Sequence, residues 1–330
     1  MSQVIEVTDL QTHLFLKRGV VKAVNGVSFH IDQGETLGLI GESGSGKTMT
    51  GLSLLGLLPK PSGRIVSGSI QLQGRELVGL DDATLSADIR GREITMISQD
   101  PMTSLNPVFT IGEQVAAPIR RHGYDTEAPA LAMAVEELGR VRVPSPEERV
   151  RDYPHQFSGG MRQRVVAAMA MGCRPKILIA DEPTSALDVT IQVQFMDLIQ
   201  TLQAETGVGL LFITHDLGVA ASLCDRVAVM YAGRIVETAS VRDLYAEPLH
   251  PYTRGLLSSV PRIGSRKPGT MAHPKARLYS IPGTPPDPLN LPQGCAFSPR
   301  CQFATEQCRQ SSPPLIAHDN RAVACFEARP

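Results

Sequence analysis

The stretch TLGLIGESGSGKT, residues 36–48, carries the strongest structural signal in the sequence. Its first five residues are apolar and strand-like, and GESGSGKT follows at once with the pattern G-x-x-x-x-G-K-[ST]. Gly41, Gly44 and Gly46 permit positive φ angles and close backbone approach, so that successive N–H groups can point at phosphate oxygens. A helix beginning near Lys47 adds the positive end of its dipole. The stretch therefore predicts a phosphate-binding loop between a strand and a helix.

The loop also carries the side chains that a nucleoside triphosphate needs. Lys47 would pair with the β- and γ-phosphates, and the Thr48 hydroxyl would bind Mg²⁺. We expect Ser43, Ser45 and Met49 to contact the same nucleotide. A glycine-rich turn without a ligand would leave the Lys-Thr pair unexplained, and a chance match in a chain of this length is on the order of one in a hundred.

A second segment, KILIADEPTSALD (176–188), supplies two adjacent carboxylates after an apolar strand. In α/β proteins ligands bind at the carboxyl edge of the sheet, where these side chains would lie. Asp181 would hold the Mg²⁺ shell. Glu182, one residue further on, can face the γ-phosphate and polarise the attacking water. Two carboxylates after a strand often only open a loop, but the upstream phosphate-binding loop favours the catalytic interpretation.

Composition excludes several classes of protein. The chain has 330 residues, of which 42% are hydrophobic and 20% charged, as in a soluble globular protein. A net charge of −1 gives no electrostatic reason to expect nucleic acid as a partner. No apolar run approaches the roughly 18 residues that cross a bilayer, and the N-terminus lacks the pattern of a secretion signal. We therefore expect a cytosolic protein, or one that sits on a membrane without entering it.

Short apolar segments alternate with helical ones through the first 240 residues, which predicts an α/β domain with a largely parallel sheet. The expected strands are residues 4–7, 27–31, 36–40, 69–73, 94–98, 177–180, 210–213 and 226–231, with a helix at 190–205. Residues 102–172 contain helical patterns at 112–121, 128–139 and 158–172, which indicates a helical insertion.

The pattern changes again after Tyr245. Residues 246–330 are rich in proline and poor in apolar periodicity, so this segment would struggle to bury enough apolar surface to fold alone. We expect two parts: an ATPase domain at 1–245 and a C-terminal extension at 246–330.

Further motifs follow the phosphate-binding loop in order: ISQDP, FSGGMRQR (157–164), the strand before Asp181, SALD and FITHD. Across residues 1–240 the chain thereby resembles an ABC-type ATPase, the nucleotide-binding subunit of ABC transporters. The resemblance implies a RecA-like core, an antiparallel β subdomain, a helical signature subdomain and an irregular C-terminal extension. It also implies ATP and Mg²⁺ as cofactors.

The resemblance assigns Ser158, Gly159, Gly160 and Gln163 to the signature motif, with Met161 and Arg162 between the glycines and the glutamine. In this family the motif opens a helix and meets the nucleotide held by the opposite subunit. The motif lies more than 100 residues from the phosphate-binding loop, so two subunits arranged head-to-tail would enclose two ATP molecules.

Four more positions receive roles in the same way. Gln99 resembles the glutamine that senses Mg²⁺ and the γ-phosphate, and His215 the switch histidine at the γ-phosphate. Asp188 fits the loop that crosses the dimer interface. An aromatic residue usually stacks on adenine, but the expected position holds Leu14; either a shift of one residue brings in Phe15, or Leu14 makes an apolar contact. We favour Phe15.

The closer resemblance is to the ATPase subunits of bacterial dipeptide, oligopeptide and nickel importers. It rests on ISQDPMTSLNPVFTIGEQV, YPHQFSGGMRQRV, ADEPTSALDVTIQ, MYAGRIVE and HPYTRGLL, and on the cysteine-bearing tail. It implies an ATPase that powers peptide import, paired with a related ATPase, two permeases and an extracytoplasmic binding protein, on the cytoplasmic face of the bacterial inner membrane. Nickel chelates or glutathione-like solutes remain alternative cargoes, and a soluble ABC ATPase is the rival class.

Four cysteines, Cys295, Cys301, Cys308 and Cys325, stand in the tail with the spacing C-x₅-C-x₆-C-x₁₆-C. Structural zinc sites usually show tighter pairs, and disulfides are uncommon in a reducing cytosol. A four-cysteine iron–sulfur site, a zinc site and free thiols all remain open on spacing alone. The resemblance favours a [4Fe–4S] cluster, with Zn²⁺ as the alternative. The other two cysteines, Cys173 and Cys224, lie in apolar helical stretches, and we expect them to be buried residues that pack in the core.

Overall fold

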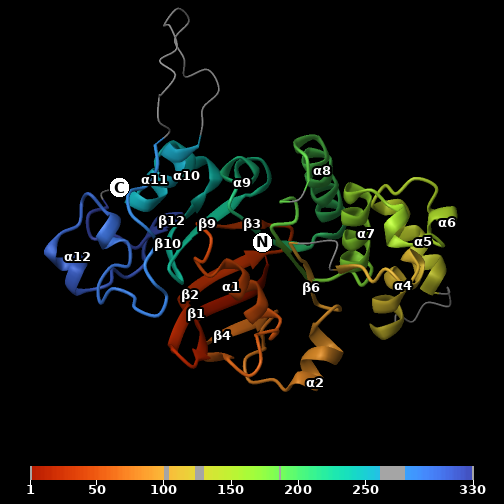
Figure 1. Ribbon diagram of the computed structural model, residues 1–330, viewed down its shortest axis with the longest axis horizontal. Helices are drawn as coiled ribbons and strands as arrows, with labels where there is room; N and C mark the ends of the chain where they lie inside the picture. Colours follow the sequence, from red (N-terminus) through yellow and green to blue (C-terminus); the bar gives the residue numbers. More distant parts are fainter. Residues whose placement is uncertain (1, 100–103, 123–129, 186, 261–278, 329–330) are drawn as a thin grey trace, which may run out of the picture.

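The computed structural model describes residues 2–99, 104–122, 130–185, 187–260 and 279–328. Residues 128 and 129, the first two of the helix expected at 128–139, therefore lie outside the described residues. The helical subdomain and the C-terminal extension lie at opposite ends of the molecule, with the sheets between them (Figure 1).

The larger sheet contains the strands that flank the predicted phosphate-binding loop and has the strand order β11-β12-β10-β9-β3-β8-β7-β6. Strands β9, β3, β8, β7 and β6 are parallel, while β10, β12 and β11 continue the sheet antiparallel. The strands are β3 (Thr36–Ile40), β6 (Ile94–Ile97), β7 (Ile177–Asp181), β8 (Gly209–Thr214), β9 (Arg226–Tyr231), β10 (Arg234–Ser240), β11 (Ile316–His318) and β12 (Arg321–Val323). The largely parallel α/β core expected from the sequence is confirmed.

The smaller sheet is antiparallel, with the order β2-β1-β4-β5. Its strands are β1 (Gln3–Leu16), β2 (Gly19–Asp32), β4 (Gly63–Leu72) and β5 (Arg75–Glu76). The hairpin of β1 and β2 is much longer than the expected segments 4–7 and 27–31. At its end, Phe15 and Leu16 on β1 and Gly19 and Val20 on β2 are exposed in succession, so the alternation that marks a half-buried strand is absent there.

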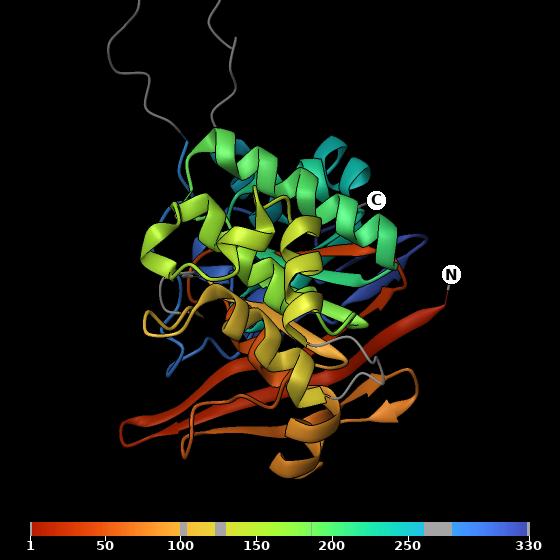
Figure 2. The same ribbon diagram turned by 90° about the vertical axis from the view of Figure 1, so that its right-hand side faces the viewer.

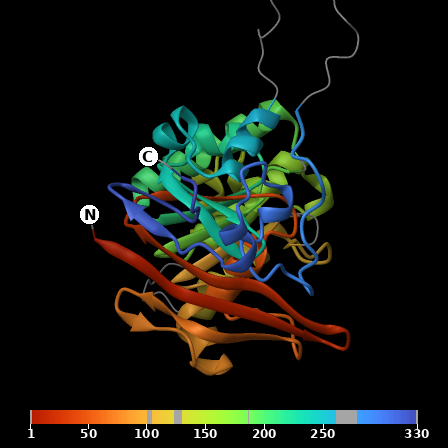
Figure 3. The ribbon, with the colours of Figure 1, turned by 90° about the vertical axis from the view of Figure 1, so that its left-hand side faces the viewer.

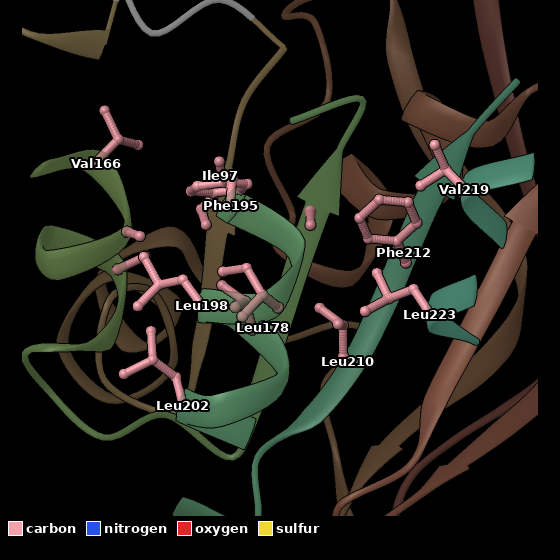
Figure 4. Packing of buried hydrophobic residues seen from close by; sticks show 14 of the residues in the cluster. Ile97, Val166, Leu178, Phe195, Leu198, Leu202, Leu210, Phe212, Val219 and Leu223 are labelled. Carbon is pink, nitrogen blue, oxygen red and sulfur yellow. The ribbon is translucent and has the colours of Figure 1, made fainter. Parts of the chain in front are cut away.

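Two apolar clusters cover the two faces of the parallel sheet and explain why its central strands are buried along their whole length. On one face, side chains of β7 and β8 pack against α7, α8 and α9 (Figure 4). On the other face, the smaller sheet and α1 cover the core. These helices are α1 (Lys47–Leu54), α7 (Gly159–Met171), α8 (Val189–Thr206) and α9 (Leu217–Leu223).

The helical insertion expected between strands is present, and its helices gather beyond the edge strand β6 (Figure 2). Its members are α4 (Ile111–His122), α5 (Ala130–Arg140), α6 (Pro146–Arg149) and α7. Apolar side chains from α4, α5 and α7, such as Val115, Leu138 and Val165, are fully buried together. The described residues also form the α-helices α2 (Asp82–Thr84), α10 (Val241–Ala246), α11 (Pro251–Ser259) and α12 (Glu306–Gln310), and the short helical segments η1 (Leu85–Ile89), η2 (Pro154–Gln156) and η3 (Ser298–Arg300).

The C-terminal extension folds against the core rather than apart from it (Figure 3). Strand β12 pairs with β10, so the extension adds the last strands of the larger sheet. Phe297, 4% exposed, packs against the rings of Tyr231, Tyr252 and His250 at centroid distances of 5.3, 5.5 and 5.8 Å. Phe297 thus shares apolar surface with β9 of the core and with α11, the helix near the start of the extension.

Candidate nucleotide site

The loop between β3 and α1 is pressed closely onto two neighbouring strands. A Cβ at Gly46, where φ is 106°, would lie 2.2 Å from the Ala23 carbonyl oxygen on β2. A Cβ at Gly41 would lie 2.2 Å from the Met230 carbonyl oxygen on β9. Only glycine tolerates both this proximity and these φ angles, so the glycines fix the path of the loop. Gly46 then caps the N-terminus of α1, as the sequence predicts.

Lys47 lies almost fully buried at the start of α1. Its Nζ donates hydrogen bonds to the carbonyl oxygens of Gly41 at 2.8 Å and Glu42 at 3.1 Å. Burial lowers the pKa of Lys47, while the carboxylates of Glu182 and Asp181 oppose this shift. A buried ammonium group held on its own loop is a ready partner for phosphate oxygens.

Asp181 ends strand β7 beside this loop. The Thr48 hydroxyl hydrogen-bonds to its carboxylate, and burial raises its pKa. Its Oδ1 atom is buried and has no hydrogen-bond partner among the described residues. A hydroxyl and an unsatisfied carboxylate oxygen side by side form an oxygen donor set that suits Mg²⁺.

Glu182 adopts a left-handed backbone conformation, with φ at 46°, and its side chain faces two other predicted site residues. The Gln99 amide nitrogen donates to its Oε2 at 3.3 Å. Its Oε1 lies 3.0 Å from Nδ1 of His215, whose side chain is 62% exposed. Non-glycine residues with positive φ carry strain that clusters at functional sites. Gln99, Glu182 and His215 follow β6, β7 and β8, so adjacent parallel strands bring them together.

One cavity of about 490 Å³ contains this constellation. Its lining includes Gln99, Glu182, His215 and the continuous run Glu42–Met49, which covers every predicted loop contact except Gly41. The sequence interpretation missed the rest of the lining, which comes from β2, the β9–β10 turn and the C-terminal extension. These residues are Val21, Lys22, Ala23, Tyr231, Ala232, Gly233, Pro285, Pro286, Pro288 and Leu291.

Phe15 is not part of this lining among the described residues. Its side chain is 45% exposed at the far end of β1, and its ring lies 5.6 Å from the Arg64 guanidinium carbon. Leu14, the alternative, is likewise outside the lining. Stacking of Phe15 on adenine stays a prediction that no contact in the structure supports.

The predicted signature residues lie on a different surface of the chain. Ser158 caps α7 by accepting a hydrogen bond from Met161 N at 3.3 Å, and Gly159 and Gly160 form the first turn of that helix. Asp188 caps α8 in the same way. The Gln163 side chain is buried, and neither of its amide atoms has a hydrogen-bond partner among the described residues. None of these residues lines the nucleotide cavity.

The four predicted cysteines of the extension converge on one small cavity. Cys295, Cys301, Cys308 and Cys325 line it together with apolar and aromatic side chains. Burial raises the pKa of Cys295, Cys301 and Cys325. No three of the four sulfur atoms, all of them in the described residues, lie within 4.8 Å of one another.

A separate cluster of His30, Asp32 and Glu35 brings its ligating atoms within 4.8 Å of one another. Arg226 accounts for it: its Nη1 lies 2.8 Å from His30 Nε2 and 3.2 Å from Glu35 Oε1. The Arg226 guanidinium thus provides the positive charge that this acidic cluster faces, so the cluster does not need a metal ion to balance it.

Comparison with known families agrees with this geometry. A family model described as ABC transporter matches residues 24–185, and one described as the C-terminal region of oligopeptide/dipeptide transporters matches residues 236–308. The described part of the chain contains no helix with the length and apolar character that membrane crossing requires.

Curated relatives match along nearly the whole chain. A probable peptide ABC transporter ATP-binding protein of Sinorhizobium fredii is 49% identical, covering 98% of this chain and 95% of the relative. The oligopeptide transport ATP-binding protein AppD of Bacillus subtilis is 48% identical, covering 99% and 97%. OppD of Haemophilus influenzae is 49% identical, covering 97% and 95%.

Solved structures match the core. A dimeric bacterial ABC transporter cassette superimposes with a TM-score of 0.64 at 26% identity, over 72% of this chain and 99% of the cassette. A post-hydrolysis ATP-binding cassette with ADP and Pi gives a TM-score of 0.63, with the same identity and coverage.

Proposed function

The chain belongs to the family of ATP-binding subunits of peptide ABC transporters, and we propose that it hydrolyses ATP to power the import of peptides. The observation that carries the proposal is the convergence of Lys47, Glu182, His215 and Gln99 on one cavity. The match of the extension to the oligopeptide/dipeptide transporter model favours peptides as cargo.

The geometry supports a division of labour among the site residues. Lys47 and the backbone N–H groups of the loop bind the β- and γ-phosphates. Glu182 polarises the water that attacks the γ-phosphate, and its contacts with Gln99 and His215 orient the carboxylate. Asp181, Thr48 and Gln99 would hold Mg²⁺, which neutralises phosphate charge when bound. The unpartnered oxygen of Asp181 and the adjacent hydroxyl fit that ion.

A second ATPase subunit completes the site in this proposal. Ser158, Gly159 and Gly160 form a helix N-terminus that suits an anion, yet they lie outside the cavity of their own chain. A head-to-tail dimer would place this turn, with Asp188, against the partner's nucleotide. A dimeric ABC cassette with a similar fold supports the arrangement. We propose a related but distinct ATPase as the partner, on two permeases at the cytoplasmic face of the inner membrane, with an extracytoplasmic binding protein.

The four cysteines of the extension are proposed to hold a [4Fe–4S] cluster. All four line one cavity, although they are spread over 31 residues of sequence. Four cysteine thiolates are the usual ligands of such a cluster, and structural zinc sites usually show closer C-x₂₋₄-C pairs than this chain has. Anaerobically purified protein should contain about four irons and matching acid-labile sulfide per chain; one zinc and no iron would overturn the assignment.

Transport itself tests the proposed cargo. The complex of this chain with its permeases, partner ATPase and binding protein would be reconstituted in proteoliposomes containing ATP. We expect ATP-dependent accumulation of radiolabelled di- or oligopeptides. Accumulation of a nickel chelate or glutathione in place of peptides would contradict the peptide assignment. Failure to co-purify with any permease would favour a soluble ABC ATPase instead.

A further inference from the structure

The lining of the nucleotide cavity divides into two chemical halves. One half is polar and holds Lys47, Glu182, His215 and the loop N–H groups, so it suits the phosphates. The other half is mainly apolar and has two sources: Val21 and Ala23 on β2, and the segment 285–291 of the C-terminal extension. We name residues 285–291 the proline segment.

The proline segment is tied to the phosphate-binding loop by one buried side chain, Arg300. Its Nη1 and Nη2 donate to the two carboxylate oxygens of Glu42 at 2.8 and 3.1 Å. Its Nε donates to the carbonyl oxygen of Pro282 at 2.9 Å, just before the segment. The planar guanidinium therefore fixes the distance between the loop and the segment.

The segment also has its own turn and its own contact with the hairpin. Asp287 accepts hydrogen bonds from Leu289 N at 2.9 Å and from the Asn290 side chain at 3.1 Å. A Cβ at Gly19, the first residue of β2, would lie 3.2 Å from the Leu289 side chain, so the segment rests directly on the end of the hairpin. These contacts hold Pro285, Pro286 and Leu291 at the cavity instead of leaving a free linker.

We propose that the proline segment forms one wall of the base-binding end of the nucleotide cavity, opposite Val21 and Ala23 on β2. The C-terminal extension is then part of the nucleotide site, and Pro286 and Leu291 take the place that Phe15, or Leu14 as the alternative, was expected to fill. This inference rests on the proposed nucleotide site.

The side chains of the proline segment determine how the nucleotide base is recognised. Proline has no N–H group, so Pro285, Pro286 and Pro288 offer ring faces to the flat surface of a base without donating to its edge. Such a wall contributes apolar contact and little discrimination between purines. The predicted ligand class is a purine nucleoside triphosphate, with ATP and GTP bound at similar affinity.

Two ligands separate a base wall from a general disturbance of the site: ATP and inorganic tripolyphosphate, which lacks a base and a sugar. Binding of each would be measured with the full-length protein, the tripolyphosphate by competition against a fluorescent ATP analogue. In Leu291→Ser and Pro286→Ser, ATP affinity should fall about three- to tenfold because apolar contact is lost. Tripolyphosphate affinity should not change.

The matched control is Leu315→Ser, the same chemical change in the extension but outside the nucleotide cavity; it should leave both affinities unchanged. Unchanged ATP affinity in the Leu291 and Pro286 variants would contradict the proposal that the proline segment contacts the base. An equal loss for ATP and tripolyphosphate would also overturn it, because the segment would then act on the phosphate loop. If wild-type protein binds neither ligand, the nucleotide site itself is wrong, which is a separate outcome.

Discussion

In the nucleotide-binding core, strands β3, β7 and β8 are buried along their whole length between two apolar layers. The last part of the C-terminal extension, residues 279–328, has strands of three residues, β11 and β12, and one large buried aromatic side chain, Phe297. The core therefore supplies its own apolar interior, whereas residues 279–328 pack on surfaces that β9, β10 and the earlier helix α11 present. A segment without a core of its own can still be ordered when a larger domain offers it an edge strand and an aromatic pocket.

The largest effect expected from this difference concerns Phe297. Phe297→Ala should destabilise the docking of the extension by about 3–5 kcal/mol, because it removes a buried ring that packs against both Tyr231 and Tyr252. Hydrogen exchange would show faster exchange of amides in the extension, while amides of β3, β7 and β8 stay protected. Phe303→Ala, at a side chain 47% exposed, is the control and should change little. Equal loss of protection in both regions would show that the extension and the core unfold as one unit.

The next effect lies in the core. Lys47→Ala should reduce ATP affinity about 100-fold, because a charge-assisted contact with the phosphates is lost. Thermal stability of the extension should not change. Lys60→Ala removes the same charge at an exposed position and serves as the control for net charge. Isothermal titration calorimetry would measure the ATP affinity of both variants. Wild-type affinity in Lys47→Ala would show that the phosphates do not bind at Lys47.

A smaller effect is expected where the two regions meet. Arg300→Gln leaves the Glu42 carboxylate without its bidentate partner and should raise the KM for ATP about tenfold. Because Arg300 positions the loop and does not touch the reacting atoms, kcat should change little. Arg300→Lys should give an intermediate KM, since it keeps the charge but not the fork geometry. Arg309→Gln, at an exposed ion pair, is the control; a fall in kcat at constant KM would contradict the positioning role.

The two regions also differ in how far the sequence predicts them. Strands β3 and β9 have the bounds expected from their apolar runs, because burial on both faces leaves an unmistakable pattern. Gln99, Glu182 and His215 meet as expected, since each follows one of three adjacent parallel strands.

For the extension, the sequence predicts the boundary near Tyr245 and the four cysteines, but not the strands or the contacts with the core. Strand β12 is too short to show periodicity, and it forms because β10 offers an unpaired edge. Nothing local marks Arg300 as the partner of Glu42, which lies 258 positions away in the chain. The lining of the cavity by Pro286 and Leu291 depends on the same tertiary contacts, so the sequence pointed instead to Phe15.

We expect Glu182 to activate water for an ATP hydrolysis that drives transport. The direct measurement is ATP turnover and peptide uptake by the reconstituted complex with Glu182→Gln, beside Glu306→Gln as an exposed control. We expect ATP binding to be retained, turnover to fall about 100-fold or more, and uptake to stop. Turnover at the wild-type rate in Glu182→Gln would contradict the role of Glu182 in activating water.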